Sequence, residues 1–204
     1  MRQPAGAMRA FVALDLPAEA RQALAAAIQQ LRAAVPRGVR WVDPAGIHLT
    51  LKFLAALEPQ QTADVLAAVG RAADCATPFQ LRLDSLGTFP NSRQPRVLWA
   101  GVAGDLATLR SLQERVEREV STLGLPQEQR DFSPHLTLGR VREDAPASVR
   151  AQIGAALATA ALAPGEPWPV TAVSLFRSTL APGGPVYTPL GSVSLRGEGS
   201  PPQP

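Results

Sequence analysis

The tetrapeptide His-Leu-Thr-Leu occurs twice in the chain, at residues 48–51 and 135–138, and the two copies contain both of its histidines. Each copy follows turn-forming residues and is rich in Leu and Thr, which is typical of a short strand with alternating faces. In such a strand the His and Thr side chains share one face, about 6 to 7 Å apart, and the two Leu side chains occupy the other. Each copy is therefore predicted to form a small polar platform on an apolar backing.

The segments around the two copies repeat the same order of strand, helix, strand, helix and strand. Besides the second tetrapeptide, strands are predicted at 9–14, 39–42, 48–53, 79–89, 97–102, 170–175 and 186–195, and helices at about 17–34, 60–73, 104–122 and 146–157. Short connections and hairpin-like neighbours favour antiparallel pairing. We predict an α+β, bilobal, pseudo-two-fold fold in which two mainly antiparallel sheets face a central cleft and the helices cover the outer faces.

The size and composition of the chain fit one compact unit. With 204 residues, 46% of them hydrophobic and 18% charged, the chain can bury a large core. We expect a single bilobal domain over residues 9–195, with flexible ends at 1–8 and 196–204. The N-terminus does not read as a leader and no run of about eighteen apolar residues occurs, so a cytoplasmic protein without membrane association is expected.

The cysteine and histidine content limits the metal chemistry that the chain can support. The single cysteine, Cys75, excludes an internal disulfide and is expected to be buried. With only two histidines beside it, no zinc-binding pattern is recognisable, so neither a metal nor another cofactor is expected. The net charge is +3 and the basic residues are almost all arginines, which bind phosphate in a bidentate manner. A compositional bias toward Ala, Arg, Pro and Gly explains the arginines equally well.

Two facing His and Thr platforms suit an in-line displacement at a phosphodiester. One imidazole removes a proton from the attacking oxygen while the other supplies a proton to the leaving oxygen, and histidine can fill both roles near neutral pH. The two Thr hydroxyls can donate to the non-bridging phosphate oxygens between them. Lys52, the one lysine of the chain, follows His48 by four residues and shares its face if the strand stays regular. Lys52 is therefore a candidate phosphate ligand.

Several runs of the sequence resemble one known family. The runs are Phe11–Pro17, Trp41, His48–Leu54, Arg96–Trp99, Phe132–Arg140 and Tyr187–Leu190. They resemble the RNA 2′,3′-cyclic phosphodiesterases, also called 2′-5′ RNA ligases, of the 2H phosphoesterase superfamily, whose signature is two His-x-Ser/Thr-x motifs. The resemblance implies a bilobal α+β fold with a central cleft and a metal-free opening of a terminal 2′,3′-cyclic phosphate to a 2′-phosphate. Some members of the family also ligate tRNA halves reversibly.

The resemblance also implies roles for particular residues. His48 and His135 are the implied catalytic pair, with His48 as the general acid and His135 as the general base. Thr50 and Thr137 are the implied phosphate ligands. The implied substrates are RNA ends with a 2′,3′-cyclic phosphate or nucleotide 2′,3′-cyclic phosphates, and the protein is expected to be a monomer.

Three further residues are candidates for the site. Arg140 matches a family arginine near the phosphate, but strict alternation places it on the face opposite His135, so the strand must end or form a bulge at Gly139. Phe11 and Phe53 are candidates for stacking on a base, and core packing is the alternative for both. Core packing is the first expectation for Phe53, whereas the two alternatives are balanced for Phe11.

Two other functions stay open from the sequence. A binding module could hold nucleotides or RNA ends in the same cleft without turnover, although intact His and Thr in both motifs argue against it. A phosphodiesterase could instead act on a small cyclic nucleotide. Both alternatives place the ligand between the same two platforms.

Overall fold

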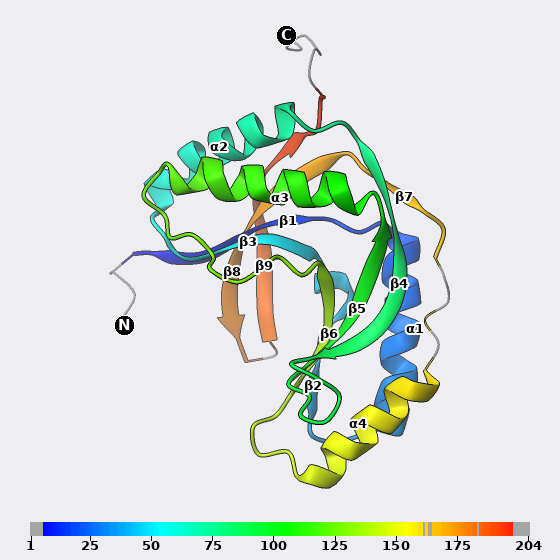
Figure 1. Cartoon of the computed structure of the whole chain (residues 1–204). Helices are drawn as coiled ribbons and strands as arrows, with labels where there is room; N and C mark the ends of the chain where they lie inside the picture. The colour runs from blue at the N-terminus through cyan, green and yellow to red at the C-terminus, as the bar shows by residue number, and fades with distance from the viewer. Residues whose placement is uncertain (1–5, 161, 163–164, 183, 198–204) are drawn as a thin grey trace.

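The structure is a computed structural model that describes residues 6–160, 162, 165–182 and 184–197 of the chain. The strands are β1 (Met8–Leu14), β2 (Val39–Trp41), β3 (Leu49–Leu57), β4 (Phe79–Phe89), β5 (Val97–Gly104), β6 (His135–Val141), β7 (Trp168–Val170), β8 (Ala172–Ala181) and β9 (Gly184–Ser194). The helices are α1 (Ala18–Ala34), α2 (Thr62–Asp74), α3 (Leu106–Ser121) and α4 (Ala147–Thr159), with short 3-10 helices η1 (Pro44–Gly46) and η2 (Pro59–Gln61). Figure 1 shows a curved sheet with the helices outside it.

The strands of the described residues form one antiparallel sheet whose order is nearly symmetric about its middle. The order is β7-β4-β5-β6-β3-β1-β8-β9, and β2 pairs with β6. The two strands that carry the tetrapeptides, β3 and β6, meet in the middle through one residue pair, Leu49 with Leu136. Because these are the second residues of the two tetrapeptides, a pseudo-two-fold axis passes through the pair. It relates β3 to β6, β1 to β5 and β8 to β4.

The two central strands separate on either side of this pair. β3 continues alongside β1, whereas β6 continues alongside β5 and takes β2 on its other edge. Since β3 and β6 are antiparallel, the residues after Thr50 run toward one end of the molecule and the residues after Thr137 run toward the opposite end. The halves of the sheet therefore diverge from the point where the two motifs meet.

Two pairs of helices cover the sheet. α2 packs beside α3, and this pair contacts β9, β8 and β3, while α1 packs beside α4 elsewhere on the molecule (Figure 1). α1 follows β1 of one half but packs with α4, which follows β6 of the other half. In the same way, α2 follows β3 of one half but packs with α3, which follows β5 of the other half. These helix contacts join the two lobes into one unit.

Apolar periodicity accounts for the packing of these elements. In α3, Leu109, Leu112 and Val116 are fully buried, at the spacing of three and four residues that one helix face requires. The four leucines of the two tetrapeptides are buried as well, as predicted for the apolar backing. The polar members of the tetrapeptides are thereby held on the opposite face.

The predicted α+β class, the antiparallel pairing and the outer helices are confirmed. The two predicted sheets are the two halves of a single sheet, joined where β3 meets β6. Met8 lies within β1, paired with Leu57, whereas most of the ends expected to be flexible lie outside the described residues. Cys75, expected to be buried, follows the last turn of α2 and is exposed. In the described part of the chain no helix has the length and apolarity to cross a membrane.

Candidate active site

The two histidines are held by the same local hydrogen bond. His48 Nδ1 lies 2.9 Å from the carbonyl oxygen of Gly46, and His135 Nδ1 lies 2.8 Å from that of Ser133, in each case two residues earlier in the chain. A carbonyl oxygen only accepts, so Nδ1 must carry the hydrogen in both rings. Nε2 of each neutral imidazole is then left with its lone pair, ready to exchange a proton with a ligand.

His48 lies in an aromatic cluster. Phe11 stacks on its ring with centroids 4.2 Å apart, and Tyr187 meets it edge-on at 5.1 Å. Burial lowers the pKa of His48 below its ordinary value of 6.5, and the hydrogen bond to the Gly46 carbonyl opposes this shift only in part. Among the nearby charges, Asp15 raises the pKa of His48, whereas Arg21 and His135 lower it. The neutral imidazole is therefore favoured at this position in the free protein.

His135 has different surroundings on the related side of the axis. Phe89 meets its ring edge-on at 5.0 Å, and the side chain is half-buried. Antiparallel pairing about Leu49 and Leu136 places Thr137 across from His48, and Thr50 across from His135. Each imidazole is thus accompanied by the threonine of the other motif.

A β-bulge in β3 changes which residues face the cleft. In the pairing of β1 with β3, Val12 is opposite Lys52 and Ala13 is opposite Thr50, so Leu51 is an extra residue. Lys52 consequently turns into the interior, where only 3% of it is exposed. Its Nζ forms an ion pair with Glu117 and donates to the carbonyl of Pro126. The prediction that Lys52 binds phosphate was wrong, because the bulge ends the alternation on which it depended.

An equivalent bulge lies in β6. Leu98 is opposite Gly139 and Trp99 is opposite Thr137, so Leu138 is the extra residue there. Arg140 is thereby brought to the face of Thr137, exposed and lining the cleft. The bulge that Arg140 required is present, one residue earlier than predicted. Gly139 occupies the position that corresponds to Lys52 and lies against β2, which leaves no room there for a side chain.

Of the two phenylalanine candidates, Phe11 takes the core-packing alternative, and Phe53, first expected in the core, is exposed. Phe11 is 2% exposed and packs on His48, so it has no free face for a base, and its stacking role is corrected to support of the imidazole. Phe53 is 48% exposed and lines the cleft, because the bulge at Leu51 puts it on the face of Thr50. The guanidinium of Arg9 lies 5.2 Å from the centre of the Phe53 ring. Phe53 therefore presents an aromatic surface to a ligand.

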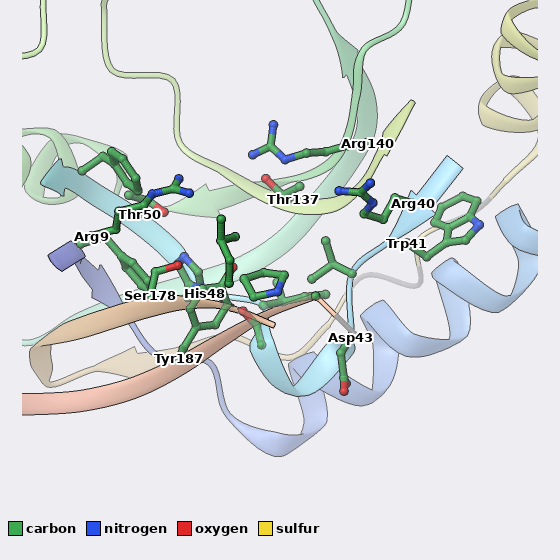
Figure 2. A pocket seen from close by; sticks show the side chains of 18 residues that line it. Arg9, Arg40, Trp41, Asp43, His48, Thr50, Thr137, Arg140, Ser178 and Tyr187 are labelled. Atoms are coloured by element: carbon green, nitrogen blue, oxygen red, sulfur yellow. Dashed lines mark hydrogen bonds between the residues drawn. The ribbon is translucent and has the colours of Figure 1, made fainter. Parts of the chain in front are cut away.

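A cleft of about 360 Å³ is lined by Phe53, Arg9 and Arg140. His48, Thr50 and Thr137 line it, while His135 is not among its lining residues. Further lining residues were not predicted from the sequence, and Figure 2 shows four of them around the same space: Arg9, Arg40, Ser178 and Tyr187. Arg9 could have been found from the sequence, because it precedes Phe11 by two residues in one strand and so shares its face. The β8–β9 hairpin that brings in the last two is distant in sequence and carries no such signal.

Arg21 of α1 fixes the backbone just before His48. Its guanidinium donates to the carbonyl of Ala45 and, at 3.4 Å, to that of Ile47, the two carbonyls on either side of Gly46. A carboxylate oxygen of Asp15 lies 3.5 Å from the same guanidinium. The turn that contains the Gly46 carbonyl, the acceptor for His48 Nδ1, is therefore stabilised by Arg21.

The side chains that could hold a metal ion are dispersed. Among the described residues, no group of three or more His, Cys, Asp or Glu side chains is gathered in that way. The cleft instead presents arginine, threonine and imidazole groups, which are suited to binding an anion directly.

Comparison with known proteins places this arrangement among its relatives. The family model described as the 2′-5′ RNA ligase superfamily matches residues 12–181. A protein of Thermus thermophilus named RNA 2′,3′-cyclic phosphodiesterase is 37% identical over 195 residues, which cover 94% of this chain and 92% of that protein.

Solved structures agree with the sequence comparison. The crystal structure of TT0787 of Thermus thermophilus has a TM-score of 0.76 and 38% identity, covering 94% of this chain and 100% of that one. E. coli LigT in complex with 3′-AMP has a TM-score of 0.69 and 29% identity, covering 93% of this chain and 98% of that one. By its fold, its doubled motif and these relatives, the chain belongs to the 2′-5′ RNA ligase superfamily.

Proposed function

We propose that the protein is a metal-independent RNA 2′,3′-cyclic phosphodiesterase that opens a terminal 2′,3′-cyclic phosphate to a 2′-phosphate. The observation that carries the proposal is the pair of histidines from the doubled motif, each with Nδ1 bound to a backbone carbonyl and Nε2 left for proton exchange. Relatives that are named RNA 2′,3′-cyclic phosphodiesterase support the substrate class. A LigT structure with 3′-AMP supports a nucleotide in the cleft.

The reaction needs two proton transfers on opposite sides of the phosphorus atom. His135 Nε2 removes a proton from a water molecule, whose oxygen bonds to phosphorus as the bond from phosphorus to O3′ breaks. His48 Nε2 gives its proton to the departing O3′, so the phosphate remains on O2′. The hydroxyls of Thr50 and Thr137 and the guanidinium of Arg140 donate to the non-bridging oxygens, where negative charge develops.

Burial of His48, the proposed general acid, disfavours its protonated form. The pKa of His48 is lowered in the free protein, so the acid form is scarce near neutral pH. A bound phosphate places a negative charge beside the ring and favours its protonated form. Substrate binding therefore recruits the proton that the leaving oxygen requires.

The same geometry also accepts a 5′-hydroxyl in place of water. Attack by a 5′-hydroxyl of a second RNA on the cyclic phosphate breaks the same bond to O3′ and forms a 2′-5′ linkage. We include this reversible ligation of RNA halves, tRNA halves among them, as a second outcome of one mechanism. Both motifs come from one chain, which supports action as a monomer.

Activity of histidine variants tests the proposal. His48→Ala and His135→Ala are each expected to lower turnover of an oligonucleotide with a 2′,3′-cyclic end by at least about 10² to 10⁴-fold, the contribution of a general acid or base. Products are read by phosphorus NMR and folding by circular dichroism, with exposed Arg37→Gln as the control variant. Wild-type protein that binds the oligonucleotide without converting it would identify a binding module instead. Conversion of cyclic mononucleotides alone would make the substrate a small cyclic nucleotide.

A further inference from the structure

Two arginines oppose each other at one end of the cleft. Arg40 of β2 is the direct partner of Arg140 of β6 in the antiparallel register. Like charges at opposed positions destabilise a strand pair, so this arrangement favours an anion that lies beside both. Both residues are exposed and line the cleft, and in the described part of the chain neither forms an ion pair with a carboxylate.

The acidic side chain among the lining residues of the cleft does not neutralise them. Asp43 lines the cleft, but its carboxylate accepts the backbone N–H of Ala45 at 3.0 Å. Figure 2 shows this carboxylate directed away from the guanidinium groups of Arg40 and Arg140. The positive charge at this end of the cleft is therefore left for a ligand.

The reacting phosphate accounts for one of the two guanidiniums. Arg140 lies three residues after Thr137, on the same face because of the bulge at Leu138, and so reaches a phosphate held by the threonines. Arg40 is carried by the neighbouring strand, farther from the two motifs. A guanidinium fork binds phosphate in a bidentate manner, so the two opposed forks offer enough donors for a second phosphate beside the reacting one.

The direction of the cleft indicates which phosphate is the second one. Phe53 and Arg140 hold equivalent positions in β3 and β6, which run in opposite directions from the central pair, so the aromatic surface and the arginine pair lie at opposite ends. A terminal nucleotide with its base on Phe53 and its cyclic phosphate beside the threonines can extend its remaining chain toward the arginine end.

We propose that Arg40 forms a second phosphate subsite, for the phosphodiester on the 5′ side of the terminal nucleotide, and so selects RNA ends over free cyclic nucleotides. This inference rests on the proposed function, because it takes the terminal cyclic phosphate as the group held between the histidines. The contact is electrostatic and independent of base identity.

Binding of product analogues tests the subsite without turnover. The ligands are adenosine 2′-phosphate and two adenosine dinucleotides with a terminal 2′-phosphate, one linked by a phosphodiester and the other by an uncharged methylphosphonate. For wild-type protein, calorimetry is expected to give a dissociation constant about tenfold lower for the charged linkage than for the neutral one, as for one charge-assisted contact. Arg40→Gln is expected to abolish this difference, and Arg37→Gln, an exposed residue before β2, is expected to keep it.

The comparison of two ligands on one protein separates the subsite from general damage. Equal affinity of the wild type for the two linkages would overturn the inference, and so would an Arg40→Gln variant that weakens all three ligands by one factor. If the variant does not fold, equal affinity of the wild type for the two linkages is still enough to overturn the inference. Turnover of the cyclic counterparts is measured separately, so a lack of turnover would remove the proposed function while the linkage dependence still reports the subsite.

Discussion

Each histidine is held by a carbonyl two residues earlier, but among the described residues an aromatic ring stacks on the face of His48 alone. The first feature is local, since a strand that enters from a turn presents that carbonyl to its own first side chain. The second feature depends on Phe11 and Tyr187, which come from strands distant in sequence. Local geometry therefore makes the imidazoles equivalent, and tertiary packing makes them different.

The lowered pKa of His48 predicts a pH dependence of stability. The folded state binds the proton more weakly than the unfolded chain, so protonation lowers the free energy of unfolding. This loss is fully present below the folded pKa of His48 and is relieved as the pH rises toward its ordinary value of 6.5. Urea unfolding at pH 5 and pH 8 is expected to show a larger gain with pH for the wild type than for His48→Gln, which cannot titrate. Equal gains in the two proteins would contradict the shift.

Local pattern in the sequence indicated which residues of each motif share a face. His48, Thr50, His135 and Thr137 were predicted to share faces because period-two alternation over three residues is reliable. The exposure of Phe53 was not predicted and that of Phe11 was left undecided, because burial of an aromatic ring is decided by neighbours from other strands. No periodicity in the sequence contains that information.

At the level of elements, the two bulges are the features that shape the site. They lie at Leu51 and Leu138, directly after the threonines, and turn the third residue after each threonine toward the cleft. Sequence reasoning required the second bulge in order to use Arg140, but had no reason to place one in β3. A bulge is set by the register of two strands, so one strand read alone does not reveal it.

Most element boundaries were predicted closely because glycine or proline residues lie next to them in the sequence. The helix predicted at 104–122 is Leu106–Ser121, which ends just before Gly124, a residue with φ of 77°. β7 was not predicted, because Trp168–Val170 is too short for a periodic pattern and contains a proline. Gly and Pro therefore mark the ends of long elements, but neither they nor periodicity reveal a strand of three residues.

The buried ion pair below the first bulge makes an element-level prediction. Lys52 of β3 holds Glu117 of α3 and the carbonyl of Pro126 in the connection that leads to β6. Lys52→Met leaves the Glu117 carboxylate without its charged partner and is expected to lower the free energy of unfolding by about 3 kcal/mol or more, whereas the added change Glu117→Leu restores part of it. Denaturant unfolding of the single and double variants measures both effects. A variant of normal stability that loses turnover a hundredfold would return Lys52 to the phosphate site.

At the scale of the whole molecule, the duplication predicted from two tetrapeptides is expressed as a sheet with a symmetric strand order. The sequence could indicate two related halves, because each motif was embedded in the same series of elements. It could not indicate that the halves join through Leu49 and Leu136, since a single long-range pair leaves no local pattern. The cleft and its hairpin wall depend on that junction, so they were predictable in outline only.

The pseudo-symmetry also leaves the assignment of acid and base to experiment. If a 2′-phosphate is the product, the bond broken is to O3′, whose alkoxide needs a proton as it departs. Replacing O3′ by sulfur gives a leaving thiolate whose conjugate acid has a pKa near the ~8.5 of cysteine, so the general acid becomes dispensable while water still needs its base. The 3′-thio cyclic substrate is therefore expected to restore much of the rate of His48→Ala and little of the rate of His135→Ala, measured by thiol release.

Rescue of His135→Ala alone would exchange the two roles. That result would fit the lowered pKa of His48, since a neutral imidazole in the free protein is the form that a general base requires. Equal rescue of both variants would show that neither histidine is a dedicated acid. The experiment thus asks whether the aromatic enclosure of His48 tunes a base directly or creates an acid that is charged only when phosphate is bound.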